Sequence, residues 1–497
     1  MTSQVRSLLA APWPVPLLIA LAVVASRLPF AADELWAWDS VLYARALERG
    51  FHVDYELPGQ RPQPPGYILY LAFAWLFRSV VGDSNAALVL VSVVASGLGA
   101  AAIFTLARRF APAPAAVIAA AAYACDPLVW LYGAVAYPYA LLGALSVVLA
   151  SLFLHAREAG PRWRAYASLT FGLVGGFRQD LYLLLGVLWL WMVWPASWRE
   201  RARCVALAAA GGLIWLVPTA ALSGGLGAYV TALGQQGDQV RSTYSVQAQG
   251  LGALWANARF TLYALAWGLL AFAILLAGVG TARALAFLRG TRDLSARTRF
   301  FAAWLLPGVL FYIAVHIGEW GYVLSVLPGL YVLAALAVGA VMRELRPRRG
   351  AAWLGLASIA ALAPALVFVT SAERFSAAAI AHHDAALAAR VAYVRERFRP
   401  EDTIVLARED FLLVRYYLPA YRAWLYDPAP HGNGAAKRKK TMRTTTIVIF
   451  TEGLTPRQSL DVRTVEASPG ITLSYFTVEP GDVLEFYGER YTVREPE

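Results

Sequence analysis

Long apolar runs separated by short polar connections fill roughly the first three quarters of the chain. A helix that crosses a bilayer needs about 20 mostly apolar residues. Runs of this kind lie near residues 13–31, 84–107, 111–132, 136–155, 165–178, 181–197, 204–222, 260–282, 300–317, 321–342 and 351–371. The pattern predicts a polytopic α-helical membrane protein with about 11 transmembrane helices. We expect the first run to be a retained span, because Phe30-Ala31-Ala32 is a poor signal-peptide cleavage site.

The polar connection after the first apolar run predicts two helices that lie along the membrane surface. Apolar residues at helical spacing indicate the first of them at residues 38–49. The side chains expected to face water on it are Arg45, Glu48 and Arg49. The stretch "RPQPPG" at 61–66 then excludes a helix and allows a tight turn into a second interfacial helix at 67–77.

From about residue 372 the composition changes to that of a small soluble domain. Runs rich in β-branched and aromatic residues predict strands at 403–407, 445–450, 471–478 and 482–488. Helical spacing predicts a helix at 409–418 between the first two strands. We therefore expect a membrane domain at residues 1–371 and a soluble α/β domain at residues 372–497.

The distribution of charge predicts which side of the membrane each connection faces. The chain is 59% hydrophobic and only 15% charged, and its net charge is +11. Arginines occupy alternate connections, at residues 6, 108–109, 157–164, 199–203, 283–299 and 343–349. By the positive-inside rule that side is cytoplasmic, so in the plasma membrane the other connections face outward. Because the predicted number of spans is odd, we expect the C-terminal domain to face outward as well. The basic excess is thus a topology signal, and no nucleic-acid partner is needed to explain it.

The outward-facing connections carry the candidate chemistry, beginning with Asp39. This acid comes directly after the first span, and a carboxylate held just above the lipid could act as a general base. The alternative is that Asp39 only caps the N-terminus of the predicted helix by accepting a backbone N–H bond. Tyr43 lies four residues later and therefore shares the helix face of Asp39.

Arg178 ends a predicted span, where an arginine needs an anionic partner. It could bind a phosphate group, or it could form a structural pair with the nearby Asp180. Arg61 and Arg241 are weaker candidates of the same kind, because exposed loop arginines are usually only solvated.

Further polar residues stand at the outer ends of other predicted spans. His316, Glu319 and Tyr322 bracket one turn, where they could bind phosphate or sugar or serve as buried polar packing. Asp126 precedes a proline and could cap or turn the chain, or face the same cavity. The glycine-rich stretch 223–259 is long for a loop, which suggests a mobile cover over the site.

No zinc-site motif of the HExxH or paired CxxC kind occurs in the sequence. His382, His383 and Asp384 are adjacent in an alanine-rich helical stretch, and we do not expect them to bind metal. No cofactor is implied with certainty, and the sequence leaves open a divalent cation, Mg²⁺ or Mn²⁺, beside a phosphate.

Several outer-face motifs resemble those of the GT-C membrane glycosyltransferases. "WDSVLYARALERG" (38–50) with "PQPPGYILYLA" (62–72) is similar to the first outer loop of the protein O-mannosyltransferase and aminoarabinose transferase group, and of relatives that read Asp…His-Pro-Pro-Gly-Tyr. The further matching stretches are "WLYGAVAYPYALLGAL" (130–145), "GGFRQDLYLLLGVLWL" (175–190) and "HIGEWGYVLSVLPGLYVL" (316–333). The chain departs from the family at Ser40 and Tyr137, where relatives often have Glu, and at Gln63, where the usual residue is His.

The resemblance implies a GT-C-like fold and a sugar donor carried on a polyprenyl phosphate. The acceptor would be a hydroxyl of a lipid, glycan or protein at the outer membrane face. It further implies an inverting displacement, in which Asp39 accepts the proton of that hydroxyl and the lipid phosphate leaves. A leaving phosphate needs positive charge or hydrogen-bond donors, and Arg178 is the first candidate to supply them. We count Tyr137 among the residues expected to contact the substrate.

Two other classes of function compete with this interpretation. A transporter or flippase for a lipid-linked sugar would be expected to show two related halves with broken helices near mid-membrane. The chain shows no similarity between its halves, and its polar residues cluster at the outer surface. A non-catalytic membrane scaffold would leave both Asp39 and Arg178 replaceable.

Overall fold

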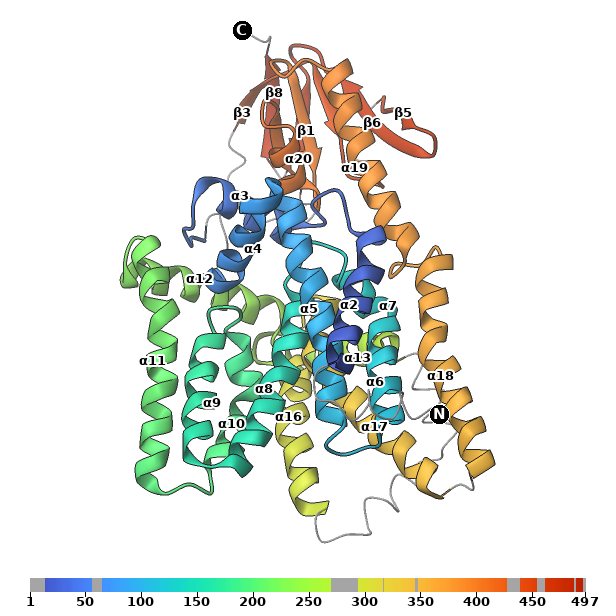
Figure 1. Cartoon of the computed structure of the whole chain (residues 1–497). Helices are drawn as coiled ribbons and strands as arrows, with labels where there is room; N and C mark the ends of the chain where they lie inside the picture. Colours follow the sequence, from blue (N-terminus) through green and yellow to red (C-terminus); the bar gives the residue numbers. More distant parts are fainter. Residues whose placement is uncertain are drawn as a thin grey trace. The chain divides into compact units, whose positions relative to one another are not determined.

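The computed structural model describes residues 14–55, 65–269, 294–315, 317–344, 347–426, 439–453, 461–486 and 489–494. The chain divides into two compact units, Met1–Ala32 with Tyr43–Ile380, and Asp33–Leu42 with Ala381–Glu497. The first unit is a bundle of helices and the second contains both β-sheets (Figure 1). The short segment Asp33–Leu42 therefore groups with the C-terminal residues, although it is separated from them by more than 300 positions in the sequence.

Helices dominate the chain up to residue 370. In chain order they are α2 (Pro14–Arg27), η1 (Leu28–Phe30), α3 (Trp38–Arg49), α4 (Ile68–Val81), α5 (Ser84–Ala107), α6 (Ala113–Cys125), α7 (Pro127–Tyr132), α8 (Tyr139–Ala159), α9 (Pro161–Val174), α10 (Asp180–Val193), α11 (Trp198–Leu222), α12 (Leu226–Tyr244), α13 (Val246–Gly268), α16 (Leu294–Ala314), η2 (Trp320–Ser325), α17 (Leu327–Glu344) and α18 (Pro347–Thr370).

Each predicted apolar run falls on one of these helices or on a consecutive pair. The remainder of the run at 260–282 lies outside the described residues. By length and composition, four described helices could each cross a membrane, namely α5, α8, α11 and residues 348–370 of α18, and several other apolar helices are shorter. The number of spans, eleven, stays a prediction.

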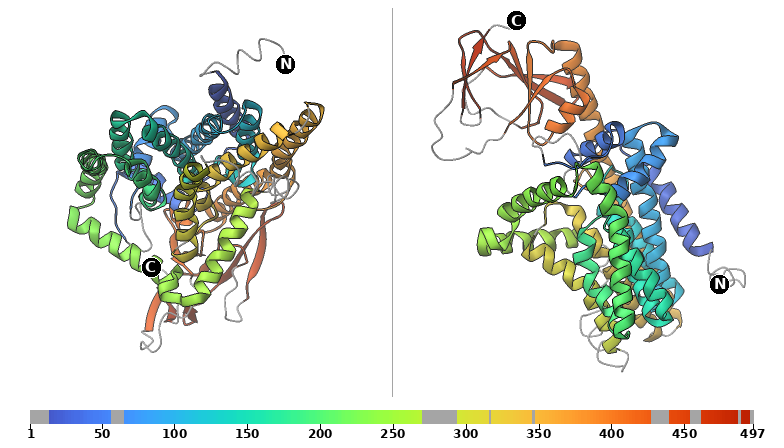
Figure 2. Two further views of the ribbon diagram at one scale, coloured as in Figure 1. Left: turned by 90° about the horizontal axis from the view of Figure 1, so that it is seen from below. Right: turned by 90° about the vertical axis from the view of Figure 1, so that its left-hand side faces the viewer.

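Helices α9 and α11 approach each other closely because glycines face their contact. They run side by side in Figure 1 and are seen from below in Figure 2. A methyl group at Gly172 would collide with the backbone oxygen of Ala208, and it would lie 2.8 Å from the backbone nitrogen of Gly212. Small residues at such contacts let membrane helices pack backbone against backbone.

We expect Gly172→Ala to lower the melting temperature of the purified protein by several degrees, because overpacking costs about 1–3 kcal/mol. Gly186→Ala on α10 is the matched control, since a methyl group there meets no atom within 4 Å. The comparison requires thermal unfolding of both variants in one detergent. Equal melting temperatures for the two variants would show that α9 and α11 can move apart without a loss of stability.

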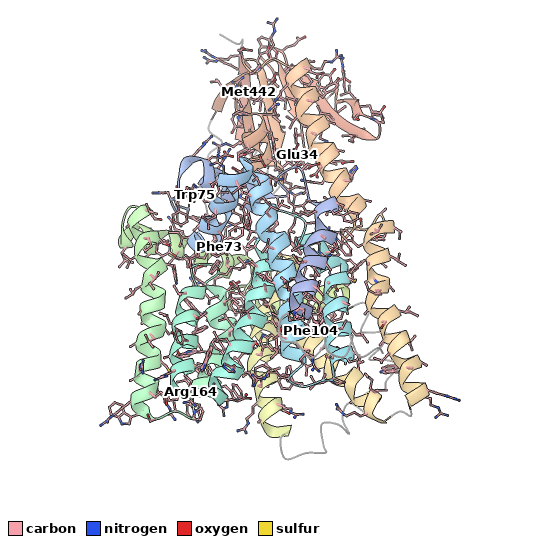
Figure 3. The ribbon with its side chains drawn as sticks, viewed as in Figure 1. Glu34, Phe73, Trp75, Phe104, Arg164 and Met442 are labelled. Carbon is pink, nitrogen blue, oxygen red and sulfur yellow. The ribbon has the colours of Figure 1, made fainter. Side chains whose placement is uncertain are left out.

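Three of the arginine-rich connections meet at one end of the helical unit. Arg109 forms an ion pair with Glu158, and Nη1 of Arg164 lies 2.6 Å from Oε1 of Glu200. Figure 3 shows Arg164 near the lower end of the helices as drawn. These pairs join the connections after α5, α8 and α10, as the charge pattern predicts.

The connections that carry candidate residues meet one another at the other end. The N–H of Leu69 donates to the carbonyl of Gly176 at 2.8 Å, which joins the start of α4 to the turn after α9. The N–H of Ala32 donates to the carbonyl of Ala134 at 2.8 Å, and the N–H of Val53 donates to Oγ of Ser223 at 3.0 Å. The two sets of connections are thus separated, while the side that faces the cytoplasm stays a prediction.

The first outer connection contains the two predicted helices, with one error in the placement of side chains. Helix α3 spans Trp38–Arg49 as predicted, and α4 extends the second helix to Val81. Arg45 was predicted to face water, and this is wrong, because its side chain is only 3% exposed. All residues from 41 to 47 are buried, so packing covers this part of the helix on more sides than its amphipathic pattern indicates.

The glycine-rich stretch 223–259 is helical, which corrects its interpretation as a long loop. Helix α12 occupies Leu226–Tyr244, and α13 begins at Val246. The hydroxyl of Tyr229 on α12 donates to the carbonyl of Pro65 at 3.2 Å. Glycines at positions 227, 234 and 237 lower helix propensity but do not prevent a helix that has tertiary contacts.

The second unit contains α19 (Ala377–Arg397, from Ala381 onward), α20 (Phe411–Tyr417) and two β-sheets. The larger sheet has the order β2-β1-β4-β6-β5, in which β1 pairs in parallel with β2 and β4, while β6 is antiparallel to β4 and β5. The smaller sheet has the order β3-β8-β7. The strands are β1 (Thr403–Ala407), β2 (Arg422–Leu425), β3 (Lys439–Arg443), β4 (Thr446–Ile449), β5 (Arg463–Ser468), β6 (Ile471–Thr477), β7 (Val483–Phe486) and β8 (Glu489–Arg494).

Candidate active site

Arg178 lies in the turn between α9 and α10, and its side chain is buried against an acid. Its Nη2 atom lies 2.7 Å from Oδ2 of Asp180, and its Nε atom lies 3.1 Å from both carboxylate oxygens. Asp180 is the first residue of α10, where the helix dipole also favours a negative charge. The structural pair that the sequence offers as an alternative is therefore present.

Three tyrosine rings surround the guanidinium group of Arg178. The ring centroids of Tyr67, Tyr139 and Tyr322 lie 5.2, 5.1 and 5.2 Å from its central carbon. The rings come from the residue before α4, the first residue of α8 and η2, so three separate connections meet here. Cation–π attraction favours this arrangement. We call Arg178, Asp180 and the three tyrosines the Arg178 cage.

The backbone at Tyr67 is strained. Its φ of 52° makes it the one non-glycine residue of the described chain in the left-handed region. Gly66 before it also has a positive φ, of 92°, and a methyl group there would overlap the side chain of Val53. Such strain persists only where the surroundings enforce it and is common at ligand sites. The turn after Pro65 thus aims the ring of Tyr67 at Arg178.

A wider aromatic cluster extends from the Arg178 cage. The ring of Tyr137 stacks on Tyr139 with centroids 5.0 Å apart, and the edge of Tyr132 packs against both rings. The hydroxyl of Tyr132 donates to Oε2 of Glu319 at 3.4 Å, and that carboxylate also accepts the N–H of Trp320 at the start of η2. An oriented hydroxyl group and a carboxylate therefore lie beside the Arg178 cage.

Tyr43 joins this cluster from α3. Its ring centroid lies 6.1 Å from that of Tyr67 and 5.3 Å from that of Tyr70 on α4. Four residues predicted to contact the substrate, besides Arg178, thus gather in one region. They are Tyr43, Tyr137, Glu319 and Tyr322.

Sequence reasoning did not single out Tyr67, Tyr132 or Tyr139. All three stand in the motifs quoted for the family resemblance, at connections between apolar runs. An aromatic residue at a span end predicts interfacial anchoring as readily as it predicts a cage. The signal that could have found Tyr67 and Tyr139 is the tyrosine that closely follows proline in "PPGY" and "AYPY", while Tyr132 stands in neither stretch.

Asp126 lies in a different polar cluster. It caps α7 by accepting the N–H of Val129 at 3.0 Å, and the hydroxyl of Tyr331 lies 3.1 Å from its Oδ2. The guanidinium carbon of the buried Arg27 lies 4.1 Å from the ring centroid of Trp130 on the same short helix. Capping, one of the two alternatives for Asp126, is thus observed, and a contact with substrate stays a prediction.

The remaining candidates are one exposed arginine and two residues that the structure does not describe. Arg241 is 58% exposed on α12 and pairs with Asp238 one turn earlier, at 2.7 Å between Nη2 and Oδ1. Such exposed pairs contribute little. Arg61 and His316 lie outside the described residues.

Asp39 lies in the first turn of α3 and is partly buried. Tyr43 follows it by four residues on the same helix, so the two side chains share a helix face as predicted. Asp39 belongs to the segment that groups with the C-terminal unit. Its role as a base stays a proposal.

Metal-ligating side chains are not clustered in the described part of the chain. Within that part, no group of three His, Cys, Asp or Glu side chains could hold a metal ion. The carboxylate nearest to Arg178, that of Asp180, is already engaged by the guanidinium group. We therefore derive no step through a metal.

Comparison with known proteins supports the resemblance seen in the motifs. The family model described as dolichyl-phosphate-mannose-protein mannosyltransferase matches residues 62–222. This segment carries the sequence pattern of a glycosyltransferase family, and it contains Tyr67, Tyr139, Arg178 and Asp180. No protein of curated function matches the chain by sequence.

The structure resembles that of ArnT from Cupriavidus metallidurans. The apo state matches with a TM-score of 0.56 at 15% identity, and the match covers 84% of this chain and 85% of that chain. The form bound to undecaprenyl phosphate matches with a TM-score of 0.55 at 14% identity and covers 84% and 86%. The chain has the GT-C fold.

The structure also resembles that of a second enzyme, with a lower TM-score. The archaeal oligosaccharyltransferase AglB of Archaeoglobus fulgidus, in complex with an inhibitory peptide and a dolichol-phosphate, matches with a TM-score of 0.50 at 14% identity. That match covers 82% of this chain and 63% of the other. The predicted fold class, a GT-C-like membrane protein with a small C-terminal α/β domain, is confirmed.

Proposed function

We propose that the chain is a membrane glycosyltransferase that moves a hexose or pentose from a polyprenyl-phosphate donor to an acceptor hydroxyl. The acceptor is a lipid, a glycan or a protein, and the reaction takes place at the outer face of the plasma membrane. The observation that supports this most strongly is the Arg178 cage, since most of it lies inside the segment that matches a glycosyltransferase family.

The proposed reaction is a single displacement. The acceptor hydroxyl gives its proton to Asp39 while its oxygen forms a bond to the anomeric carbon. The bond between that carbon and the phosphate oxygen breaks, and its electron pair leaves with the polyprenyl phosphate. Because attack and departure occur on opposite faces of the sugar, the anomeric configuration inverts.

In this mechanism Arg178 stabilises the charge that grows on the leaving phosphate. A guanidinium group has five N–H donors. The bonds to Asp180 use only the N–H of Nε and one N–H of Nη2, so three donors are not committed to that acid. Burial of this cation at 3% exposure makes its attraction for a phosphate stronger than it would be in water. Asp180 holds the guanidinium in place before the donor arrives.

Incubation of the reconstituted protein with a panel of polyprenyl-phosphate sugars and candidate acceptors tests the proposal. We expect mass spectrometry to detect one glycosylated product and an equal amount of released polyprenyl phosphate. Movement of the intact donor between leaflets without a product would support the flippase alternative. Neither product nor movement with any donor of the panel would support the scaffold alternative.

A glycine packs against one ring of the Arg178 cage, and its substitution tests how donor binding depends on the position of that ring. Gly321 in η2 lies directly against the ring of Tyr139, so a methyl group there would collide with the ring. We expect Gly321→Ala to raise the half-saturating donor concentration about 2- to 30-fold, because the displaced ring of Tyr139 loses its cation–π contact with Arg178, a kind of contact that contributes about 0.5–2 kcal/mol.

The measurement for Gly321→Ala is a donor titration of the transfer rate. Gly227→Ala on α12 is its control, since a methyl group there meets no atom within 4 Å. An unchanged donor titration in Gly321→Ala would mean that the position of the Tyr139 ring does not matter for donor binding.

A further inference from the structure

The second unit contains a cluster of side chains that hold a piece of backbone from the start of the chain. The carboxylate of Asp384 on α19 accepts the N–H of Asp33 at 2.8 Å and the N–H of Glu34 at 3.3 Å. The hydroxyl of Tyr417 on α20 accepts the N–H of Leu35 at 2.9 Å. Three consecutive backbone donors are therefore bound by two side chains that lie about 350 and 380 positions away in the sequence.

His383 holds the same segment from the carbonyl side. Its Nε2 lies 3.1 Å from the carbonyl oxygen of Leu35. A carbonyl can only accept, so the ring carries its proton on Nε2. The ring also packs against Trp36, with centroids 4.6 Å apart. Both backbone groups of Leu35 are thus bound, its N–H by Tyr417 and its carbonyl by His383.

The charge states at neutral pH suit these contacts. Burial raises the pKa of Asp384 to about 6, and the N–H groups of Asp33 and Glu34 oppose that shift. The carboxylate is therefore ionised at pH 7 and accepts both bonds. Burial lowers the pKa of His383, so its ring is neutral there.

The held segment leads directly to the proposed general base. Helix α3 begins at Trp38, and Asp39 lies four residues after Leu35 in its first turn. The ring of Trp38 packs against Phe411 on α20, with centroids 6.0 Å apart. The backbone immediately before Asp39 is thus fixed by α19 and α20, which leaves the first turn of α3 little freedom to reorient.

We propose that Asp384, His383 and Tyr417 are positioning residues, through which the second unit holds Asp39 in its reactive orientation. This inference rests on the proposed function. It assigns the second unit a role in the reaction, and it gives His383 and Asp384 a role other than metal binding. A misplacement of about 1 Å at a reacting group can lower a rate about 100-fold, so loss of the hold should slow transfer.

The test compares Asp384→Ala and Tyr417→Phe with two controls in the full-length reconstituted protein. Glu396→Ala removes an exposed acid from the same helix. Tyr421→Phe removes a hydroxyl that bonds to the carbonyls of Val394 and Phe398, elsewhere in the same unit. The readouts are amide hydrogen exchange at residues 33–42, and kcat and KM for the donor.

We expect both test variants to exchange faster at residues 33–35 and to lose about 10- to 100-fold in kcat with little change in donor KM. The controls should keep the exchange and the kcat of the parent protein. When Asp39 is already replaced by asparagine, Asp384→Ala should lower the residual rate no further. Independent losses in that background, or faster exchange with an unchanged kcat, would overturn the positioning role.

Hydrogen exchange separates failure of this inference from failure of the proposed function. Unchanged exchange at residues 33–35 in Asp384→Ala would overturn the hold itself, whether or not the protein transfers sugar. If the parent protein transfers no sugar but Asp384→Ala exchanges faster, the hold is supported. The catalytic part of the inference then falls with the proposed function.

Discussion

Asp39→Asn is expected to reduce sugar transfer by about 100- to 10,000-fold, the range usual for loss of a general base. The amide has nearly the shape of the carboxylate, but it cannot accept the proton of the acceptor hydroxyl. Donor binding should be unchanged, because the proposed contact with the phosphate is made by Arg178. The measurement is the single-turnover rate at saturating donor together with the affinity for polyprenyl phosphate.

This substitution also separates catalysis from helix capping. Asparagine caps a helix N-terminus about as well as aspartate, so a capping role predicts a normal rate in Asp39→Asn. Glu48→Gln provides a control, since it makes the same acid-to-amide change at an exposed position of α3. A rate near that of the parent protein in Asp39→Asn would remove Asp39 as the base.

The second large effect is expected when the charge of Arg178 is removed. Replacing Arg178 alone would leave the half-buried Asp180 without its partner, and breaking a buried ion pair can destabilise a protein by about 3–5 kcal/mol. The double substitution Arg178→Gln with Asp180→Asn avoids this problem, because two amides can still bond to each other. We expect the half-saturating donor concentration to rise about 10- to 150-fold, since a hydrogen bond to a charged group contributes about 1.5–3 kcal/mol.

A matched ion pair at the opposite end of the bundle serves as the control. Arg164 and Glu200 are 2.6 Å apart between Nη1 and Oε1 and are 13% and 16% exposed. The control variant is Arg164→Gln with Glu200→Gln, which removes both charges of that pair in the same way. Donor titrations of the two double variants decide whether Arg178 binds the donor or is only structural. Equal titrations would make Arg178 a purely structural residue.

The fold was largely predictable because bilayer spans and buried strands leave strong apolar patterns. Strands β1, β4, β6 and β7 and helix α20 fall where the pattern predicts them. Strands β2, β3, β5 and β8 were not predicted. Of these, β2 and β5 lie at edges of the larger sheet, and their largely unburied residues lack the apolar run of a central strand.

The candidate site was predictable in part, because charge and connection ends identify where polar residues gather. Arg178, Glu319 and Tyr322 were found in this way, and the structure brings them into one region. The ring of Tyr139 was not found, since only tertiary packing turns an aromatic span end toward a cation.

Long-range backbone contacts leave no local signal in the sequence. The bonds from Asp384 and Tyr417 to residues 33–35 could not be predicted, because these side chains have ordinary helical neighbours. The burial of Arg45 was mispredicted for a related reason. Its long apolar stem allows the residue to pack inside while the helix pattern marks it as polar.

The single-turnover rate of sugar transfer, measured against donor concentration, tests the central claim most directly. Asp39→Asn should lower the maximal rate without moving the half-saturation point. The neutral pair at positions 178 and 180 should move the half-saturation point to higher donor concentration. A parent protein without turnover, or two variants that both follow its curve, would contradict the account.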